Sequence, residues 1–389
     1  MTSGSRPTQG HLVLADISGY TAFLTGTELE HAQAIIHELT TLIRERLAPP
    51  LRFVKLEGDA VFCYADEAAF PDGERLVELI EACYFDFSNR QDNMVRGTTC
   101  RCNACASMGS LGLKFIAHFG TYVLQPSGGI DDLAGPDVIL VHRLLKNSIT
   151  EALGVQAYVF FTDACRQHLP ASFDLPRHAE TYDSFGETAG GVHDLTPVLQ
   201  EMHATRHISI APGEADLEQI FELPYPPAIV WRYVVDPLER QRWACRLFDK
   251  NPDTHVPNER GRLGAGAGSH CSHGPGTAMR EYVDWRPFDY FTCHMTATGR
   301  LGMMWRPTIE TMEFVPLDGG GTRVEHRFRA ENRSGLSFLW YQASMLGFRA
   351  GARSALSTLK TIMDEDAAAL EGETVVETAP TSKKDVTGR

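Results

Sequence analysis

The chain of 389 residues lacks the features that mark membrane, secreted and nucleic-acid-binding proteins. No apolar run approaches the ~18 residues of a membrane-spanning helix. The apolar run after the polar segment Met1–Gly10 stops at Asp16, too short for the core of a signal peptide. Positive charge is scarce, because 36 Lys and Arg residues face 50 Asp and Glu residues, a net charge of −14. Since an acidic chain repels phosphate backbones and anionic lipids, we expect neither nucleic-acid nor membrane partners.

Cysteine does not form the pattern of a disulfide-bonded secreted protein. The chain has nine cysteines, an odd number; three lie close together at Cys100, Cys102 and Cys105, and the others are scattered. We therefore expect a cytoplasmic protein with reduced thiols. The sequence has no internal repeat, and no Ser-His-Asp or Cys-His triad can be placed by its spacing.

The composition is that of a globular protein, with 43% hydrophobic and 22% charged residues. At roughly 150 residues per domain, this length predicts two or three domains. Strand and helix patterns alternate up to about residue 195. After residue 206 the pattern changes to mostly strands with glycine-rich connections. We expect domains at 8–195 and 207–370, a linker at 196–206 and a disordered tail at 371–389.

The first domain shows clear local patterns. The apolar run His11–Ala15 predicts a strand, and the period of apolar residues over Glu28–Ala48 predicts a helix that ends at two prolines. Two apolar runs around Glu57-Gly58-Asp59 predict a β-hairpin. The remaining elements that we expect are a helix over Gly73–Asn89, a long strand from Leu111, a helix over Asp137–Ile149 and a strand from Ala157.

Two aspartates have positions that suit metal binding. Asp16 comes where the first strand is expected to end, and Asp59 comes at the tip of the hairpin. Mg²⁺ prefers one or two carboxylates together with substrate phosphates, and two such ions can clamp the attacking and leaving oxygens of a displacement. The alternative is that each aspartate is an ordinary turn residue.

Five segments of the N-terminal half form an ordered series. They are Asp16-Ile17-Ser18-Gly19-Tyr20-Thr21; Lys55 with Asp59; Lys114 to Gly120 with His118; Asp132-Leu133-Ala134-Gly135 with Val138 and Arg143; and Ala179 to Leu195. In this order and spacing, the series resembles the motifs of the class III nucleotidyl cyclase catalytic domain over about residues 8–195. The resemblance implies an α+β, ferredoxin-like fold with a mixed or antiparallel sheet.

The resemblance also implies roles for these residues. Asp16 and Asp59, with the backbone carbonyl of Ile17, would bind two Mg²⁺ or Mn²⁺ ions. Lys55 and Asp132 would read the adenine edge and select ATP, since Lys donates to a ring nitrogen and Asp accepts from the exocyclic amine. The backbone amides of Gly19, Tyr20 and Thr21 would hold the triphosphate, and Arg143 would stabilise the developing phosphate charge.

Members of this family act as head-to-tail dimers, so the resemblance implies a homodimer. The metal ligands and the base-reading residues of one site would then come from opposite chains. One position departs from the family pattern. Members of the family usually carry an Asn four residues before the Arg that matches Arg143, and this Asn orients the ribose; here the position is Ile139. Asn147 lies on the same helical face, but nothing in the sequence indicates that it reaches the ribose.

The cysteine triplet Cys100-x-Cys102-x-x-Cys105 can wrap one Zn²⁺ ion, which takes four nitrogen or sulfur ligands. Only three are local. The nearest other cysteine, Cys83, falls on the core face of its helix, so a histidine or a residue of a partner chain is the better fourth ligand. Redox chemistry and incidental clustering stay open as alternatives.

The second domain predicts a different architecture. After a strand, a Pro-Pro break and a short helix from Phe221, we expect strands near Met279–Trp285, Tyr290–Thr298, Thr308–Phe314 and Arg323–Arg329, and a long helix over Leu336–Asp366. With Glu281 and Trp285-Arg286-Pro287-Phe288, this order resembles the START/Bet v 1-like (polyketide cyclase-like) helix-grip group. That implies a curved antiparallel sheet around a long C-terminal helix and a cavity for a small apolar ligand, lipid-like or aromatic. Five apolar residues either line the cavity or belong to the core: Phe338, Trp340, Tyr341, Met345 and Phe348.

The segment His270-Cys271-Ser272-His273 has residue types that bind zinc. Neighbouring side chains on a strand point to opposite faces, so we expect a strand edge here.

These observations predict an adenylate cyclase-like signalling protein that converts ATP to cyclic AMP and is regulated by a small apolar ligand in its second domain. Two alternatives stay open: a catalytically weak or inactive nucleotide-binding regulatory protein, and a lipid- or aromatic-ligand-binding protein with a degenerate cyclase domain. A further alternative makes the second domain an enzyme that acts on an apolar substrate.

Overall fold

The computed structural model describes residues 6–70, 73–127, 130–171, 173–204, 207–244, 254–259, 261–273, 276–298, 306–333 and 336–378. The chain divides into two compact units. Unit 1 comprises Met1–Ile208 together with Pro257–Gly264 and Asp284–Pro287, and unit 2 comprises the rest. Among the described residues, no helix has both the length and the apolar character needed to cross a bilayer.

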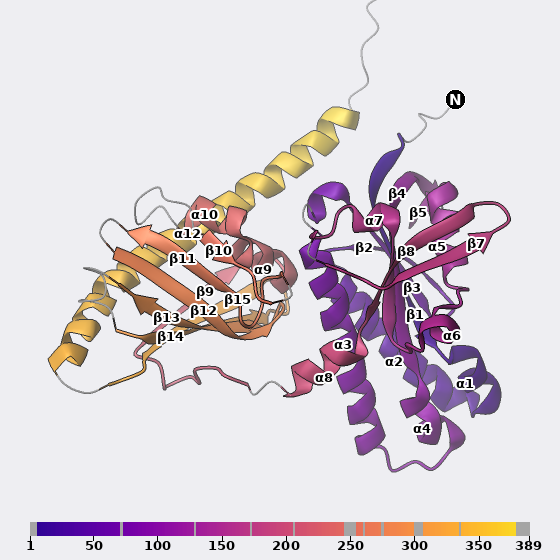
Figure 1. Cartoon of the computed structure of the whole chain (residues 1–389), viewed down its shortest axis with the longest axis horizontal. Helices are drawn as coiled ribbons and strands as arrows, with labels where there is room; N and C mark the ends of the chain where they lie inside the picture. Colours follow the sequence, from indigo (N-terminus) through magenta and orange to yellow (C-terminus); the bar gives the residue numbers. More distant parts are fainter. Residues whose placement is uncertain are drawn as a thin grey trace, which may run out of the picture. The chain divides into compact units, whose positions relative to one another are not determined.

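Unit 1 is built on an eight-stranded sheet in the order β2-β3-β1-β4-β6-β8-β7, with β5 paired to β4 (Figure 1). Strands β4 and β6 are parallel, whereas β1 is antiparallel to both of its neighbours. The sheet is therefore mixed, as expected. Its strands are β1 Thr8–Ser18, β2 Arg52–Glu57, β3 Ala60–Asp66, β4 Gly112–Ser127, β5 Ile130–Ala134, β6 Tyr158–Thr162, β7 Arg177–Tyr182 and β8 Gly186–Asp194.

The long helices α2 and α3 of unit 1 pack side by side (Figure 1). The apolar residues that recur along α2, among them Ile36, Leu39 and Ile43, are buried, which confirms the period read from the sequence. The helices and turns are α1 Tyr20–Gly26, α2 Leu29–Leu47, η1 Glu67–Ala69, α3 Glu74–Gly97, α4 Asn103–Ser107, η2 Met108–Ser110, α5 Pro136–Leu144, α6 Ile149–Leu153, α7 Asp163–Arg166 and α8 Thr196–Ala204.

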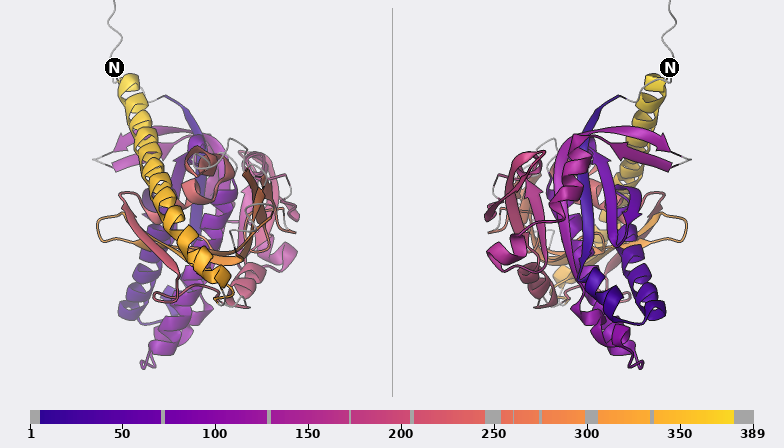
Figure 2. Two further views of the ribbon diagram at one scale, coloured as in Figure 1. Left: turned by 90° about the vertical axis from the view of Figure 1, so that its left-hand side faces the viewer. Right: turned by 90° about the vertical axis from the view of Figure 1, so that its right-hand side faces the viewer.

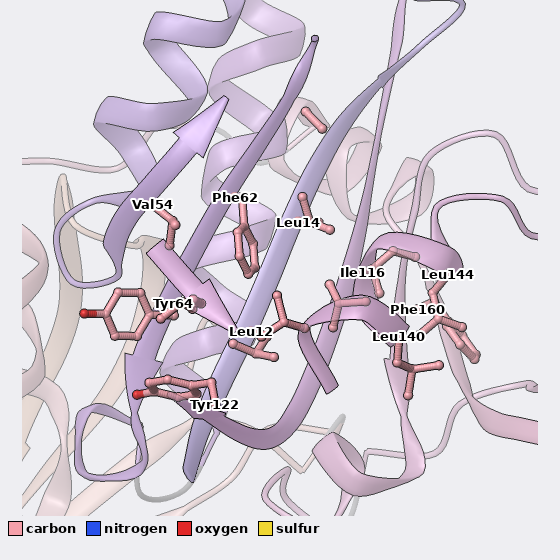
Figure 3. Close-up of a cluster of buried hydrophobic side chains, with 14 of the residues drawn as sticks. Leu12, Leu14, Val54, Phe62, Tyr64, Ile116, Tyr122, Leu140, Leu144 and Phe160 are labelled. Carbon is pink, nitrogen blue, oxygen red and sulfur yellow. The ribbon is translucent and has the colours of Figure 1, made fainter. Parts of the chain in front are cut away.

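The central strand β1 is buried on both faces, and its side chains alternate between them. Leu12 and Leu14 point into one hydrophobic cluster with Phe62 of β3 and with Leu140 and Leu144 of α5 (Figure 3). Each such buried side chain contributes roughly 1.5–3 kcal/mol. The cluster fixes α5 against the sheet and so positions the residues on the outer side of that helix.

Unit 2 has a seven-stranded sheet in the order β10-β11-β12-β13-β14-β15-β9 and a long last helix, α12, which Figure 2 shows as one continuous helix. Buried Trp231 packs edge-on against Phe288, Phe291 and Phe314. The elements are β9 Leu217–Leu223, α9 Pro227–Val235, α10 Pro237–Trp243, β10 Thr254–Val256, β11 Gly268–His273, β12 Gly276–Arg286, β13 Tyr290–Ala297, β14 Thr308–Pro316, β15 Thr322–Ala330 and α12 Leu336–Thr378.

Three segments differ from the expectation. The helix expected over Asp137–Ile149 ends at Leu144, and a second helix begins at Ile149. Between them, the side-chain amide of Asn147 donates to the carbonyl of Leu144 at 2.7 Å and accepts from the backbone amide of Ile149 at 3.1 Å. These side-chain bonds replace the backbone bonds of a continuous helix. The expected linker contains helix α8. Helix α12 runs to Thr378, into the expected disordered tail, whose residues 379–389 lie outside the described ranges.

Candidate functional site

Asp16 lies inside β1, two residues before the strand ends. In the register of β1 and β4 it stands opposite Lys114, whose Nζ is 3.4 Å from Oδ2 of Asp16. The same ammonium donates to the carbonyl of Leu145 at 3.1 Å. Both charged side chains are mostly buried, at about one-fifth exposure. The expectation that the strand stops at Asp16 is wrong, because pairing with β4 carries it through Ser18.

Asp59 lies in the β2–β3 turn, next to Gly58, whose φ of 68° favours glycine. Burial, and then the charge of Asp16, raise the pKa of Asp59 to about 7, although a backbone hydrogen bond at Ile17 and the ammonium of Lys114 oppose the rise. The described part of the chain thus places two carboxylates beside the single ammonium of Lys114. Such a pair attracts cations.

Ile17 lies next to both aspartates, but its side chain is 1% exposed and belongs to the core. Its backbone is therefore the part that can face a ligand. Gly19, with φ 87°, begins helix α1, and its carbonyl accepts from the amide of Phe23 at 2.9 Å. The ring of Tyr20 lies 3.9 Å from the position a Cβ on Gly58 would take, so the Gly19–Thr21 turn is next to the β2–β3 turn.

Lys55 of β2 and Asp132 of β5 form an ion pair, with Nζ 3.1 Å from Oδ1 and 3.2 Å from Oδ2. Burial opposes both charges, but the hydrogen bond between them, together with further hydrogen bonds and neighbouring charges, outweighs it. The pKa of Lys55 is therefore raised and that of Asp132 is lowered. Both side chains keep more than a third of their surface exposed. The two residues named for base recognition therefore lie together and face solvent.

This pair is part of a larger charged group. Nζ of Lys55 is also 3.1 Å from Glu57, whose other oxygen is 3.0 Å from Nδ1 of His142 on α5. Burial lowers the pKa of His142. The positive charge of Lys55 lowers it further, whereas the carboxylate of Glu57 opposes the change. The charges acting on Asp132 come from Lys55 and His142, whereas those acting on Asp59 come from Asp16 and Lys114. The Asp16, Asp59 and Lys114 group is thus separate from the group of Lys55, Glu57, Asp132 and His142, and these are the two charged groups considered below.

Arg143 and Ile139 both lie on the outer side of α5. Arg143 is exposed, and Ile139 is 54% exposed. The start of this helix is fixed by Asp137, which accepts from the amide of Thr121 at 2.6 Å. Gly120 makes room for it, because a Cβ there would lie 2.6 Å from the Asp137 side chain. The His-x-Gly segment of β4 therefore serves to seat α5.

The side chain of Asn147 is occupied by hydrogen bonds within the chain. Its side-chain amide is used by Leu144, Ile149 and the hydroxyl of Tyr158, the last at 2.8 Å. Those bonds shape the α5–α6 turn.

The sequence alone does not indicate that Lys114, Glu57 and His142 belong to the charged groups. Lys114 was visible only as part of a motif, and its place opposite Asp16 depends on the β1–β4 register. The cysteine triplet was found, and the structure adds His31 of α2 to it.

The apolar ligand cavity expected in unit 2 stays a prediction. A hollow of about 450 Å³ lies between edge strand β9 and α12, and charged as well as apolar residues line it. Tyr341 and Met345 are buried, and neither lines this hollow. Phe338 is partly buried, and the side chains of Trp340 and Phe348 lie outside the described set. The lining includes Phe221, Leu223, Leu356, Arg349, Arg353 and Lys360.

The segment Gly268–His273 forms strand β11, as expected. His270 is partly buried, and the side chains of Cys271 and His273 are outside the described set.

A family model described as a protein of unknown function, DUF2652, matches residues 11–153. This range includes both charged groups of unit 1 and the cysteine triplet.

Solved structures similar to this chain include class III cyclases. A bacterial light-regulated adenylyl cyclase matches with a TM-score of 0.37 and 12% identity, over 51% of this chain and 57% of that one. The guanylyl cyclase Cya2 matches with a TM-score of 0.36 and 11% identity, over 49% of this chain and 94% of that one. The chain thus spans little more than half of the first of these proteins. Similarity at these scores does not establish an activity or a substrate.

A curated relative is more similar in sequence. "Uncharacterized protein Rv2561/Rv2562" of Mycobacterium tuberculosis (strain ATCC 25618 / H37Rv) is 34% identical over 153 residues, which are 38% of this chain and 68% of that protein. The chain therefore belongs to the same family as the mycobacterial protein Rv2561/Rv2562.

Proposed function

We propose that unit 1 is a nucleotidyl cyclase that converts ATP to cyclic AMP in a homodimer, with two divalent cations. The observation that carries this proposal is the Asp16–Asp59 pair, in which burial and mutual repulsion raise the pKa of Asp59 to about 7 beside one ammonium. Partly buried carboxylates that repel each other are costly to a fold and are typical of sites that bind a cation.

The oxygen atoms at this place suit Mg²⁺ or Mn²⁺. The carboxylates of Asp16 and Asp59 and the backbone carbonyl of Ile17 are hard ligands, and Lys114 holds Asp16 in position. Bound ions would supply stabilisation of charge on the attacking and leaving oxygens. In the reaction the 3′-oxygen of ATP bonds to the α-phosphorus, the bond from this phosphorus to the β-bridging oxygen breaks, pyrophosphate leaves, and the hydroxyl proton passes to solvent.

Base recognition falls to Lys55 and Asp132. An ammonium has three donors and a carboxylate has about four acceptor positions, so their 3.1 Å contact leaves both able to bind a nucleobase. Adenine presents an acceptor nitrogen beside a donor amine, which this pair complements side by side. Guanine presents the reverse order of donor and acceptor at that edge, so ATP is the expected substrate.

The separation of the two charged groups supports a shared site between two chains. Asp16 and Asp59 of one chain would hold the cations, while Lys55, Asp132 and Arg143 of the other would hold the base and the phosphates. Ile139, at 54% exposure, places apolar surface one helical turn before Arg143 on α5, where a second copy would cover it. A two-fold dimer would contain two such sites.

Unit 2 would bind a regulatory small ligand. Its hollow of about 450 Å³ has apolar walls from Leu223 and Leu356 and basic groups from Arg349, Arg353 and Lys360, which fit a small molecule with an apolar body and an acidic group. Regulation requires that this ligand bind two states of the protein with different affinity. A ligand that raises the Tm of the protein without changing turnover would contradict the regulatory role.

The test is incubation of the full chain with ATP and Mn²⁺, with chromatography and mass spectrometry of the product. Cyclic AMP and pyrophosphate are expected in equal amounts, with GTP as the poorer substrate. Asp16→Ala should reduce turnover by at least ~100-fold, as for loss of one electrostatic element of an active site. Asp92→Ala, which removes an exposed carboxylate of α3, is the control and should have no effect. Unchanged turnover in Asp16→Ala would contradict the proposal.

A second candidate function is nucleotide binding without turnover, and Ile139 favours it. An apolar side chain cannot orient the ribose, so the chain would bind ATP and cyclise it slowly. Ile139→Asn distinguishes the two: a rise in turnover supports a cyclase limited at this position. Metal-dependent ATP binding with no cyclic product from either protein supports the binding function.

A further inference from the structure

The three neighbouring cysteines surround a histidine from a distant part of the sequence. Nδ1 of His31, in the first turn of α2, lies 3.2 Å from Sγ of Cys102, 3.6 Å from that of Cys105 and 3.7 Å from that of Cys100. One ligand atom from each of the four residues lies within 4.8 Å of the others. A nitrogen and three sulfurs therefore face a common centre.

Hydrogen bonding does not explain this arrangement. Nδ1 of an imidazole carries either one N–H or one lone pair, so it can satisfy one sulfur well. A Zn²⁺ ion bonds to sulfur at about 2.3 Å and to nitrogen at about 2.0–2.1 Å, so the nitrogen–sulfur edges of its tetrahedron are roughly 3.5 Å long. The three observed separations bracket this length. We infer that His31, Cys100, Cys102 and Cys105 bind one Zn²⁺ ion.

The surrounding contacts hold the ligands in place without the metal. Sγ of Cys102 accepts from the amide of Cys105 at 3.4 Å, which closes the Cys-x-x-Cys turn at the start of α4. Glu28, at the start of α2, accepts from the amide of Ala104 at 3.1 Å and ties the two helices together. Gln91 of α3 donates to the carbonyls of Met108 and Leu111 at 2.8 and 2.7 Å. Contacts that orient metal ligands in this way are typical of built sites.

The donor set selects the metal. Three thiolates and an imidazole suit zinc, whereas Mg²⁺ and Mn²⁺ prefer oxygen. Four protein ligands close the coordination shell, so the site is structural. It is distinct from the oxygen donors of Asp16 and Asp59, and the inference does not depend on the proposed cyclase activity.

The position of the site gives it a structural role. It joins the start of α2 to the segment that connects α3 with β4. That segment ends beside the Gly19 turn, where the carbonyl of Ser110 lies 3.8 Å from the place a Cβ on Gly19 would take. The zinc ion would therefore hold the segment before β4 in place next to the Gly19–Thr21 turn.

The experiment measures metal content and coordination in the full chain. Protein purified under reducing conditions and passed through metal-free buffer should contain about one zinc per chain by mass spectrometry of the elements. Replacement by Co²⁺ should give the intense visible bands of tetrahedral cobalt and a near-ultraviolet thiolate-to-metal band. Removal of zinc with a chelator should lower the Tm, and added zinc should restore it.

Variants at His31 keep the test clear even where a cysteine variant fails to fold. Loss of a residue that only orients a ligand costs 10–100-fold in affinity, so His31→Gln should weaken zinc binding by at least about 100-fold in chelator competition. His31→Cys should keep zinc and shift the cobalt bands toward those of four thiolates. His37→Gln, at an exposed histidine of the same helix, is the control and should change nothing.

Three results would overturn the inference. The first is fully reduced protein that takes up neither Zn²⁺ nor Co²⁺. The second is equal zinc affinity in His31→Gln and wild type, which would remove His31 from the site. The third is a disulfide among Cys100, Cys102 and Cys105 in protein handled under reducing conditions, which would assign the triplet to redox chemistry.

Discussion

Glu310 of unit 2 and Asp59 of unit 1 are both carboxylates whose ionised form is opposed by burial. The two carboxylates differ in the groups that surround them. In unit 2, Glu310 of β14 is fully buried. Its oxygens lie 2.6 Å from Nε2 of His326, 3.0 Å from Nε of Arg280 and 3.1 Å from the donating thiol of Cys293. Burial opposes ionisation, but the hydrogen bond and charge of His326, the charge of Arg240 and the hydrogen bond from Cys293 together outweigh it and lower the pKa of Glu310.

In unit 1, Asp59 is less buried, yet its pKa changes in the opposite direction, to about 7. Among the described residues, the charges that act on it are those of a second carboxylate, Asp16, and of the Lys114 ammonium. The difference separates two uses of a buried acid. A carboxylate whose partners all come from the protein supports the fold, whereas a carboxylate short of positive charge marks a place that an external cation can occupy.

The largest expected effect is on the stability of unit 2. Glu310→Ala leaves the charge of Arg280 and the ring of His326 without their buried acceptor, which should lower the free energy of unfolding by about 3–5 kcal/mol. Denaturant unfolding followed by tryptophan fluorescence measures it. The control is Glu313→Ala on the same strand. Its side chain is 42% exposed, and its partner Arg327 keeps Glu218 and Glu325, so the substitution should cost about 1 kcal/mol or less. Equal losses in both variants would break the comparison.

The second prediction concerns activity in unit 1, where the carboxylates are expected to serve the site and not the fold. Asp59→Ala and Arg143→Ala chains should each fold and each lose at least ~100-fold in turnover. Mixed together, they should recover activity, because one of the two sites in a mixed dimer contains neither substitution. Activity assays on the separate and mixed chains measure this. Failure of the mixture, where wild type is active and dimeric, would contradict the shared site.

The third prediction concerns the Lys55–Asp132 pair, which is ion-paired like Glu310 but more exposed to solvent. Lys55 and Asp132 are paired but exposed, so Lys55→Ala should change the free energy of unfolding by no more than about 1 kcal/mol. The preference for ATP over GTP should fall by about tenfold or more, because a base-reading donor is lost. Competition between the two nucleotides measures this, with exposed Lys146→Ala as control. A large loss of stability with unchanged preference would assign the pair to the fold.

Most of the fold could be predicted from the sequence because the governing patterns are local. The apolar period of α2 and the paired runs around Gly58 each follow from which face of a short segment is buried. The division of the helix after Leu144 could not be predicted, because it depends on side-chain bonds of Asn147 that only the folded chain forms. The same holds for α8, where an expected linker is helical.

The candidate site divides in the same way. Asp16 and Asp59 were found from their positions in the chain, and the resemblance to cyclases named Lys55 and Asp132, which the structure places 3.1 Å apart. Lys114 and His31 depend on tertiary packing: the first on the register of β1 with β4, the second on the approach of α2 to α4. A lysine or histidine with no motif around it gives no sign in the sequence of which acid or thiol it will meet.

The smallest expected effect tests the comparison through pH. The pKa of Asp59 rises from 3.8 in the unfolded chain to about 7 in the metal-free fold, so the folded state holds a proton that the unfolded state has released. Stability from this group is therefore full below about pH 4, falls as pH rises toward 7 and stays low above it. Asn cannot ionise, so Asp59→Asn should raise the free energy of unfolding at pH 8 by about 1–2 kcal/mol, discounted for the exposed part of the carboxylate, and leave it unchanged near pH 4. Denaturant unfolding in chelator-treated buffer measures both values, and Asp92→Asn should show no such dependence.

Mn²⁺ should stabilise wild type at pH 8 and not the variant, since a bound cation would neutralise the carboxylate pair that the substitution removes. If Asp59→Asn is destabilising at pH 8, Asp59 is a structural acid like Glu310, and the contrast between the two units does not hold.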